Sequence, residues 1–65
     1  MEKYPVEERL LKAIEVAEIL NISRAMAYRL MQTRQIPTVR IGTSRRVRLV
    51  DLQNYIKANL MPANA

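Results

Sequence analysis

The sequence predicts a small α+β domain, mainly α-helical, in which three short helices accompany a two-stranded antiparallel hairpin. Apolar residues recur at helical spacing in residues 13–20, 24–33 and 51–60, which indicates amphipathic helices. Residues 38–49 instead alternate between apolar and polar or basic side chains around Gly42, as is typical of a hairpin. A chain of 65 residues forms one domain at most, with a thin core.

The first helix, residues 13–20, has an apolar face and an acidic face, the latter carrying Glu15 and Glu18. Its apolar face comprises Ala13, Val16, Ala17 and Leu20. Asn21 follows, and asparagine tolerates the left-handed conformation that ends helices. Ile22 is expected to fill the turn as an apolar plug. Residues 1–9 are expected to form an arm, since Pro5 blocks a helix there.

Ser23 is a favourable N-cap for a second helix that runs to about Thr33. At about 100° per residue, the face expected to be buried carries Met26, Ala27, Leu30 and Met31. The opposite face carries Arg24, Ala25, Tyr28 and Gln32, with Arg29 at its edge. A short turn followed by a helix with an apolar back and a polar front is the helix-turn-helix pattern of DNA-binding proteins.

The hairpin is predicted to begin after Pro37, which ends the second helix. The register that turns the apolar residues inward pairs Ile41 with Val47 and Val39 with Leu49. In this register Arg40 and Arg48 turn outward together, and Arg45 and Arg46 lie at a Gly-Thr-Ser tip. The hairpin is therefore expected to form a wing with an apolar inner side and a basic outer side.

A last helix is expected over residues 51–60, with Pro62 closing it. Its apolar stripe comprises Leu52, Tyr55 and Ile56. The elements together predict a winged helix-turn-helix domain over residues 10–60, with a two-stranded wing, a C-terminal helix and a tail of residues 61–65.

The net charge of +5 comes from one segment of the chain. Residues 21–48 have a net charge of +7 and no acid, whereas residues 1–20 have −2 and residues 49–65 have 0. The bases of this segment are all arginines: Arg24, Arg29, Arg34, Arg40, Arg45, Arg46 and Arg48. Arginine binds phosphate and guanine edges bidentately. A basic surface that only maintains solubility is the alternative, but solubility does not require so long a segment without acids.

Several classes of function are disfavoured by composition. The chain has no Cys and no His, so neither disulfides nor zinc or other metal sites are expected. Its Ser and Thr residues have no His partner, and a single glycine cannot form a Gly-rich phosphate loop. We therefore expect no enzymatic activity and no cofactor. No apolar run approaches the roughly 18 residues of a membrane helix, so an intracellular protein is expected.

The candidate DNA contacts fall into two sets. The second helix is expected to enter the major groove through Ser23, Arg24, Ala25, Tyr28, Arg29 and Gln32. The wing is expected to follow the adjacent minor groove or backbone through Arg40, Thr43, Ser44, Arg45, Arg46 and Arg48. For Tyr28 two roles stay open, since its ring can stack over the edge of the core or its hydroxyl can donate to a phosphate.

Residues 10–60 resemble the excisionase-type helix-turn-helix proteins, which share the winged-helix core of the MerR-type DNA-binding domain. The resemblance rests on Glu15, Ala17 and Leu20, on "ISRAMAYRL", on Ile36-Pro37, on the Arg-rich hairpin and on "VDLQNYI". Three positions depart from the family pattern: Asn21 and Arg34 stand where Gly is usual, and Lys12 where a capping Thr or Ser is usual. The second helix is therefore expected to end differently, and the first to begin weakly.

The resemblance implies a recombination directionality factor of a phage or mobile element in a bacterial cytoplasm, associated with the nucleoid. Such a protein binds attachment-site DNA as several head-to-tail copies, bends it and helps an integrase to assemble the excision complex. Two alternatives stay open: a small winged-helix transcriptional regulator, and an antitoxin-like module that binds another protein. An RNA-binding protein is disfavoured because Tyr28 is the only aromatic residue of the basic segment.

Overall fold

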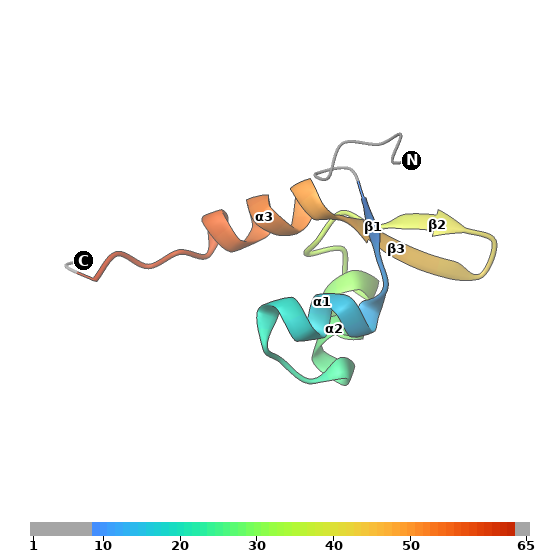
Figure 1. Cartoon of the computed structure of the whole chain (residues 1–65), viewed down its shortest axis with the longest axis horizontal. Coiled ribbons are helices and arrows are strands. Elements are labelled where there is room, and N and C mark those ends of the chain that lie inside the picture. Colours follow the sequence, from blue (N-terminus) through green and yellow to red (C-terminus); the bar gives the residue numbers. More distant parts are fainter. Residues whose placement is uncertain (1–8, 64–65) are drawn as a thin grey trace.

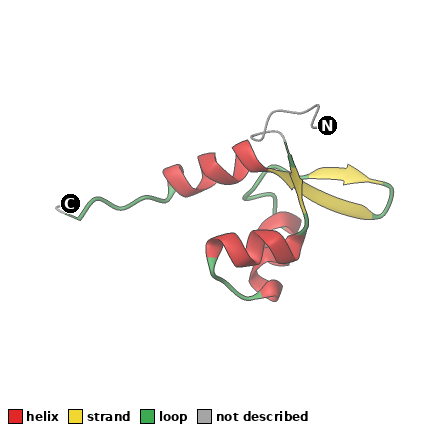
Figure 2. Cartoon of the chain, viewed as in Figure 1, coloured by secondary structure: helices red, strands yellow, loops and turns green. Residues whose placement is uncertain are grey.

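The computed structural model describes residues 9–63 as three helices and three short strands (Figure 1). In chain order the elements are β1 (Leu10–Leu11), α1 (Ala13–Leu20), α2 (Arg24–Gln32), β2 (Val39–Ile41), β3 (Ser44–Arg48) and α3 (Leu49–Ala58). Helices α1 and α2 pack together on one side of the sheet, while the β2–β3 hairpin and α3 extend in opposite directions from it (Figures 1 and 2). This arrangement confirms the α+β, mainly helical, winged helix-turn-helix fold. Residues 1–8 of the predicted arm and residues 64–65 of the tail lie outside the described residues.

Helix α1 begins at Ala13, as predicted, although Lys12 is its N-cap. An ammonium group has no lone pair with which to accept a hydrogen bond, so the lysine side chain cannot cap the helix. The carboxylate of Glu15 contributes instead, because its Oε1 atom accepts the backbone N–H of Lys12 at 2.8 Å. The other oxygen of Glu15 lies 3.4 Å from Nη2 of Arg9. An acid inside the first turn thus supports a helix start that lacks a capping hydroxyl.

Both α1 and α2 end in the left-handed geometry of a Schellman motif. Asn21 has φ 56° and ψ 48°, as its residue type predicts, and Ile22 donates its N–H to the carbonyl of Ala17 at 3.0 Å. At the end of α2, Arg34 has φ 61° and the N–H of Gln35 reaches the carbonyl of Leu30 at 3.0 Å. The expectation that α2 ends differently is therefore wrong, because Arg34 adopts the conformation that glycine would adopt without strain.

The sheet has three strands in the order β1-β3-β2, one more than the predicted hairpin supplies. The added strand is β1, whose residues Leu10 and Leu11 pair with Arg48 and Val47 of β3. This pairing places Leu11 beside Val47 on the buried face, where their exposed fractions are 3% and 0%. The N-terminal end of the domain is thus joined to the strand that leads into α3.

The predicted register of the wing is wrong. The observed pairs are Ile41 with Ser44, Arg40 with Arg45 and Val39 with Arg46, so the turn consists of Gly42 and Thr43 alone. Gly42 has φ 60°, and this left-handed residue lets a two-residue turn close the hairpin earlier than the predicted tip. Arg45 and Arg46 consequently lie within β3, not at the tip, and Leu49 begins α3 rather than pairing with Val39.

The register differs from the predicted one by an odd number of residues, which exchanges the two faces of β2 relative to β3. Ile41 is therefore 55% exposed rather than directed inward with Val47. Arg40 shares a face with Arg45, and not with Arg48 as predicted. The wing arginines consequently lie on both faces of the ribbon, not on a common side.

The core lies where α1, α2, β3 and the first turn of α3 meet. Its buried residues are Leu11, Ala13, Val16, Ala17, Ala27, Leu30, Met31, Ile36, Val47 and Leu52, and the predicted turn residue Ile22 packs against them. Two further predicted core positions differ. Met26 is 41% exposed at the edge of the buried face of α2, and Ile56 is 42% exposed because α3 leaves the body after its first turns. Helix α3 also begins at Leu49, two residues before the predicted start at Asp51, and ends at Ala58.

Candidate nucleic-acid interface

The front of α2 is an exposed face supported from behind by the core. Ala27, Leu30 and Met31 are buried, which leaves the rest of the helix at the surface. The exposed residues include every candidate contact predicted on this helix: Arg24, Ala25, Tyr28, Arg29 and Gln32. No hydrogen bond or ion pair within residues 9–63 involves the guanidinium group of Arg24 or of Arg29. Two guanidinium groups on this face are thus available to an anion.

The start of α2 is fixed by Ser23, whose Oγ atom accepts the backbone N–H of Met26 at 3.1 Å. This confirms the predicted N-cap. Tyr28 is 51% exposed, and its ring is not among the side chains that pack against the core. Of its two predicted roles, this placement favours a hydroxyl directed to a ligand over a ring stacked on the core.

The wing brings two arginines directly opposite each other. Arg40 and Arg45 form a cross-strand pair, and side chains in such a pair have Cβ atoms about 4.5–5.5 Å apart. Arg40 donates from Nε to the carbonyl of Gly42 at 3.3 Å, whereas the Arg45 side chain has no hydrogen bond within the described part of the chain. Like charges placed opposite each other destabilise a sheet. This pair therefore favours binding of an anion.

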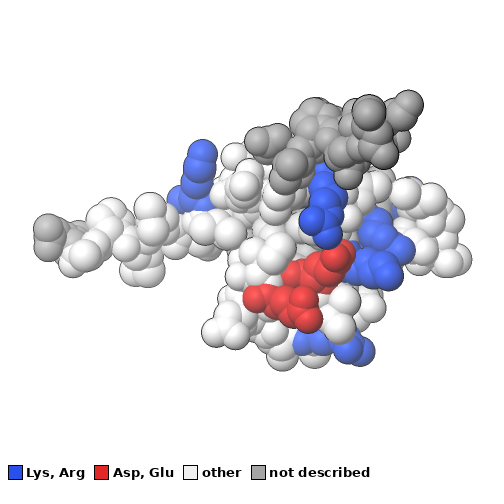
Figure 3. Space-filling model, viewed as in Figure 1, with Lys and Arg blue, Asp and Glu red and all other residues white. Residues whose placement is uncertain are grey.

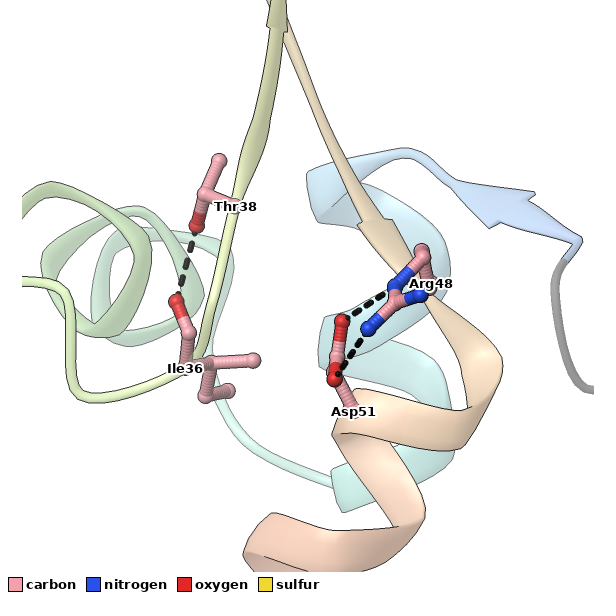
Figure 4. Close-up of polar contacts among 4 residues, drawn as sticks. All are labelled: Ile36, Thr38, Arg48 and Asp51. Atoms are coloured by element: carbon pink, nitrogen blue, oxygen red, sulfur yellow. Dashed lines mark hydrogen bonds and ion pairs between the residues drawn. The ribbon is translucent and has the colours of Figure 1, made fainter.

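The other face of the wing carries Arg46 and Arg48, and both have partners in the protein. Nη1 of Arg46 donates to the carbonyl of Arg45 at 2.8 Å. Arg48 binds Asp51 bidentately, with Nε 2.7 Å from Oδ2 and Nη2 3.0 Å from Oδ1 (Figure 4). The carboxylate offsets the charge of Arg48, so this arginine anchors the first turn of α3 in addition to any contact with DNA.

Sequence reasoning did not identify Asp51 as a partner. The signal was an acid placed three residues after an arginine at the start of a helix, a spacing that brings the two side chains together. Of the remaining wing candidates, Thr43 lies in the turn and Ser44 opposite Ile41, and both are exposed.

The connection between α2 and the wing is held in place by short-range contacts. Ile36 is fully buried, which fixes the chain just before Pro37. The hydroxyl of Thr38 donates to the carbonyl of Ile36 at 2.9 Å (Figure 4). These contacts set where the wing begins relative to the exposed front of α2.

Asp51 of α3 binds Arg48 of the wing, but the other described acids lie on α1, outside these two basic surfaces. Figure 3 shows them gathered in one patch, at the place that α1 occupies in Figure 1. Glu15 and Glu18 belong to α1, whereas residues 21–48, which contain the front of α2 and the wing, have no acid. Charge therefore separates an acidic α1 from a basic α2 and wing.

Two further features of residues 9–63 bear on function. This part of the chain contains no group of His, Cys, Asp or Glu that could hold a metal ion. None of its helices is long and apolar enough to cross a membrane.

Comparison with known protein families adds a decisive observation. A family model described as a helix-turn-helix domain matches residues 10–60, which span both helices of the motif, the wing and α3. The chain belongs to this helix-turn-helix family. The match suggests DNA binding for the domain. No curated protein and no solved structure matched the helix-turn-helix chain.

Proposed function

We propose that this helix-turn-helix protein binds double-stranded DNA sequence-specifically, without catalysing a reaction. The observation that carries the proposal is the Arg40–Arg45 pair on the wing, two like charges held opposite each other in a segment without acids. Phosphates of a DNA backbone relieve this repulsion, because each guanidinium then has an anionic partner. The exposed Arg24 and Arg29 of α2 extend the basic surface to the helix that the family uses as its motif.

In the proposed complex, α2 enters the major groove and the wing follows the adjacent minor groove or backbone. Arg24 and Arg29 contact base edges and flanking phosphates, and the exposed N-terminus of α2 at Ser23 faces a phosphate. Arg40, Arg45 and Arg46 contact the backbone beside the wing. Arg48 contributes less than its charge suggests, since Asp51 binds it at two points.

We further propose that the protein is an excisionase, which bends attachment-site DNA and directs an integrase toward excision of a phage or mobile element. The resemblance of residues 10–60 to excisionase-type proteins supports this role, and the matched family includes such proteins. A bend of 40–90° costs on the order of 1–6 kcal/mol, which phosphate contacts from several copies offset.

Contacts with an integrase or with further copies on DNA need exposed surface outside the basic face. Ile14 and Ile19 of α1 are 41% and 49% exposed, and Leu60 and Met61 beyond α3 are 73% and 83% exposed. These exposed apolar side chains, on α1 and beyond α3, supply such a surface. In a bacterial host the protein would act at the nucleoid.

DNA binding is tested by fluorescence anisotropy with a random-sequence duplex and with duplexes selected from a random library, over a series of salt concentrations. Arg45→Gln is expected to weaken binding to both and to reduce the slope of log K against log[salt] by about 0.9, the loss of one phosphate contact. Lys57→Gln on α3 removes the same charge from a distant site and serves as the matched control. Equal slopes for wild type, Arg45→Gln and Lys57→Gln would contradict the proposed wing contact.

Base reading is tested with Arg24→Ala on the same duplexes. This variant is expected to lose about 1–3 kcal/mol on the selected duplex and to discriminate less between duplexes. Equal losses on selected and random DNA would contradict a reading role for Arg24.

The excision role is tested by footprinting on the DNA beside an integrated element. Tandem protected sites in an attachment-site arm, together with stimulated excision by the integrase, are the expected result. A single protected site in a promoter would instead indicate a transcriptional regulator. Absence of protection, with a stable protein complex recovered in its place, would indicate an interaction module.

A further inference from the structure

Arg34 occupies a strained backbone position, and its side chain makes no hydrogen bond or ion pair within residues 9–63 that would offset the strain. Its φ of 61° lies in the left-handed region, where the Cβ of an ordinary residue crowds the following carbonyl oxygen. Among described residues other than glycine, only Asn21 shares this property, and asparagine tolerates the region through its short polar side chain. Arginine has no such local compensation.

The strain follows from the fold around the end of α2. The chain must reverse there so that Ile36 enters the core, where it is fully buried. The reversal is held by the N–H groups of Arg34 and Gln35, which donate to the carbonyls of Met31 at 3.3 Å and Leu30 at 3.0 Å. Only backbone groups take part in these bonds, so glycine would serve at least as well at position 34.

The side chain of Arg34 does not offset the strain inside the protein. It is exposed, and no hydrogen bond or ion pair within residues 9–63 involves its guanidinium. Residues held in strained backbone conformations cluster at active sites and ligand contacts. A charged side chain kept at such a position therefore suggests a ligand of opposite charge.

The position of Arg34 identifies that ligand. It lies between the end of α2 at Gln32 and the start of β2 at Val39, the two elements that carry the basic surfaces. In the proposed complex one strand of the DNA backbone passes between the groove that holds α2 and the groove that the wing follows. We propose that Arg34 binds a phosphate of this strand, joining the two contacts, at the expense of fold stability.

This inference rests on the proposed DNA binding and predicts opposite effects on stability and affinity. Arg34→Gly relieves the strain and removes the charge, so its Tm is expected to rise by about 4–8 °C while DNA affinity falls about tenfold. Arg34→Gln keeps the strain and removes only the charge, so its Tm is expected to stay at the wild-type value while affinity falls similarly. Arg34→Lys keeps both the strain and the charge.

The experiment measures Tm by circular dichroism and binding of the full chain to a random-sequence duplex over a salt series. Arg34→Gln and Arg34→Gly are expected to reduce the salt slope by about 0.9, and Arg34→Lys to keep it. Lys57→Gln, on α3, controls for loss of one positive charge, and Asn21→Gly controls for relief of a left-handed residue outside the basic surface.

A salt slope in Arg34→Gln equal to that of wild type would overturn the inference while leaving DNA binding intact. An equal loss of slope in Lys57→Gln or in Arg34→Lys would also overturn it, since neither the site nor the charge would then matter. A wild-type protein that fails to bind any duplex would instead refute the proposed function itself.

Discussion

The bidentate pair between Arg48 and Asp51 gives a prediction with two separate readouts, fold stability and DNA affinity. Asp51→Asn keeps the shape of the side chain but removes its charge and one of its two acceptor oxygens. The carboxylate is only 11% exposed and receives bonds of 2.7 and 3.0 Å, whereas the arginine side chain is 47% exposed. The pair joins β3 to α3, so its loss is expected to destabilise the fold.

The magnitude follows from these contacts. A hydrogen bond to a charged group contributes about 1.5–3 kcal/mol, and solvent around the half-exposed arginine reduces that figure. The substituted asparagine would retain one neutral bond, but the helix would lose an acid from its first turn, which contributes about 0.3–1 kcal/mol. The net expected loss is about 1–2 kcal/mol, or about 5–15 °C in Tm for a domain of this size.

Thermal unfolding followed by circular dichroism measures this loss, with Glu18→Gln as the matched control. Glu18 is exposed on α1, and its side chain has no bond within residues 9–63, so the control makes the same charge change without breaking a pair. Its stability is expected to stay within about 0.5 kcal/mol of wild type. DNA affinity of Asp51→Asn should not fall, because the substitution removes a negative charge beside Arg48 and raises the net positive charge of the protein. Equal Tm values for Asp51→Asn and Glu18→Gln would refute the anchoring role.

Two other substitutions test the N-cap of α2 and the packing of α3 against the core. Ser23→Ala removes the acceptor for the Met26 N–H and is expected to cost about 0.5–2 kcal/mol in urea unfolding; Ser44→Ala, which breaks no side-chain bond, should leave stability unchanged. Leu52→Ala empties a fully buried site and is expected to cost about 2–5 kcal/mol, whereas Leu60→Ala, at a residue 73% exposed, should cost little. A stable Leu52→Ala protein would contradict the central packing of α3.

The helices of the motif were predictable because their signals are local. Helical spacing identified the buried faces of α1 and α2, and Ser23 and Asn21 marked their ends by residue type alone. Met26 was misassigned because a helical angle does not say how far the neighbouring elements extend around the helix. The exposure of Met26 depends on how α1 and the core pack against α2, and the spacing of residues within α2 does not reveal this packing.

The wing and its neighbours depended on longer-range information. The predicted and the observed register of the hairpin both preserve the alternation of apolar and polar side chains. Only the position of the turn, at Gly42 and Thr43, distinguishes them. The third strand exists because Leu10 and Leu11 find partners in β3, far along the chain, and two apolar residues give too short a signal. The sequence identified the basic segment correctly, but the pairing of Arg48 became visible only once α3 was seen to start at Leu49.

The salt dependence of binding to duplex DNA tests most directly whether the uncompensated arginines of α2 and the wing meet a phosphate backbone. With about four to six phosphates contacted, affinity is expected to fall on the order of 10²- to 10³-fold between 50 and 200 mM salt. A wild-type affinity that stays constant over this range, or no detectable binding at 50 mM salt, would contradict DNA as the partner of these arginines.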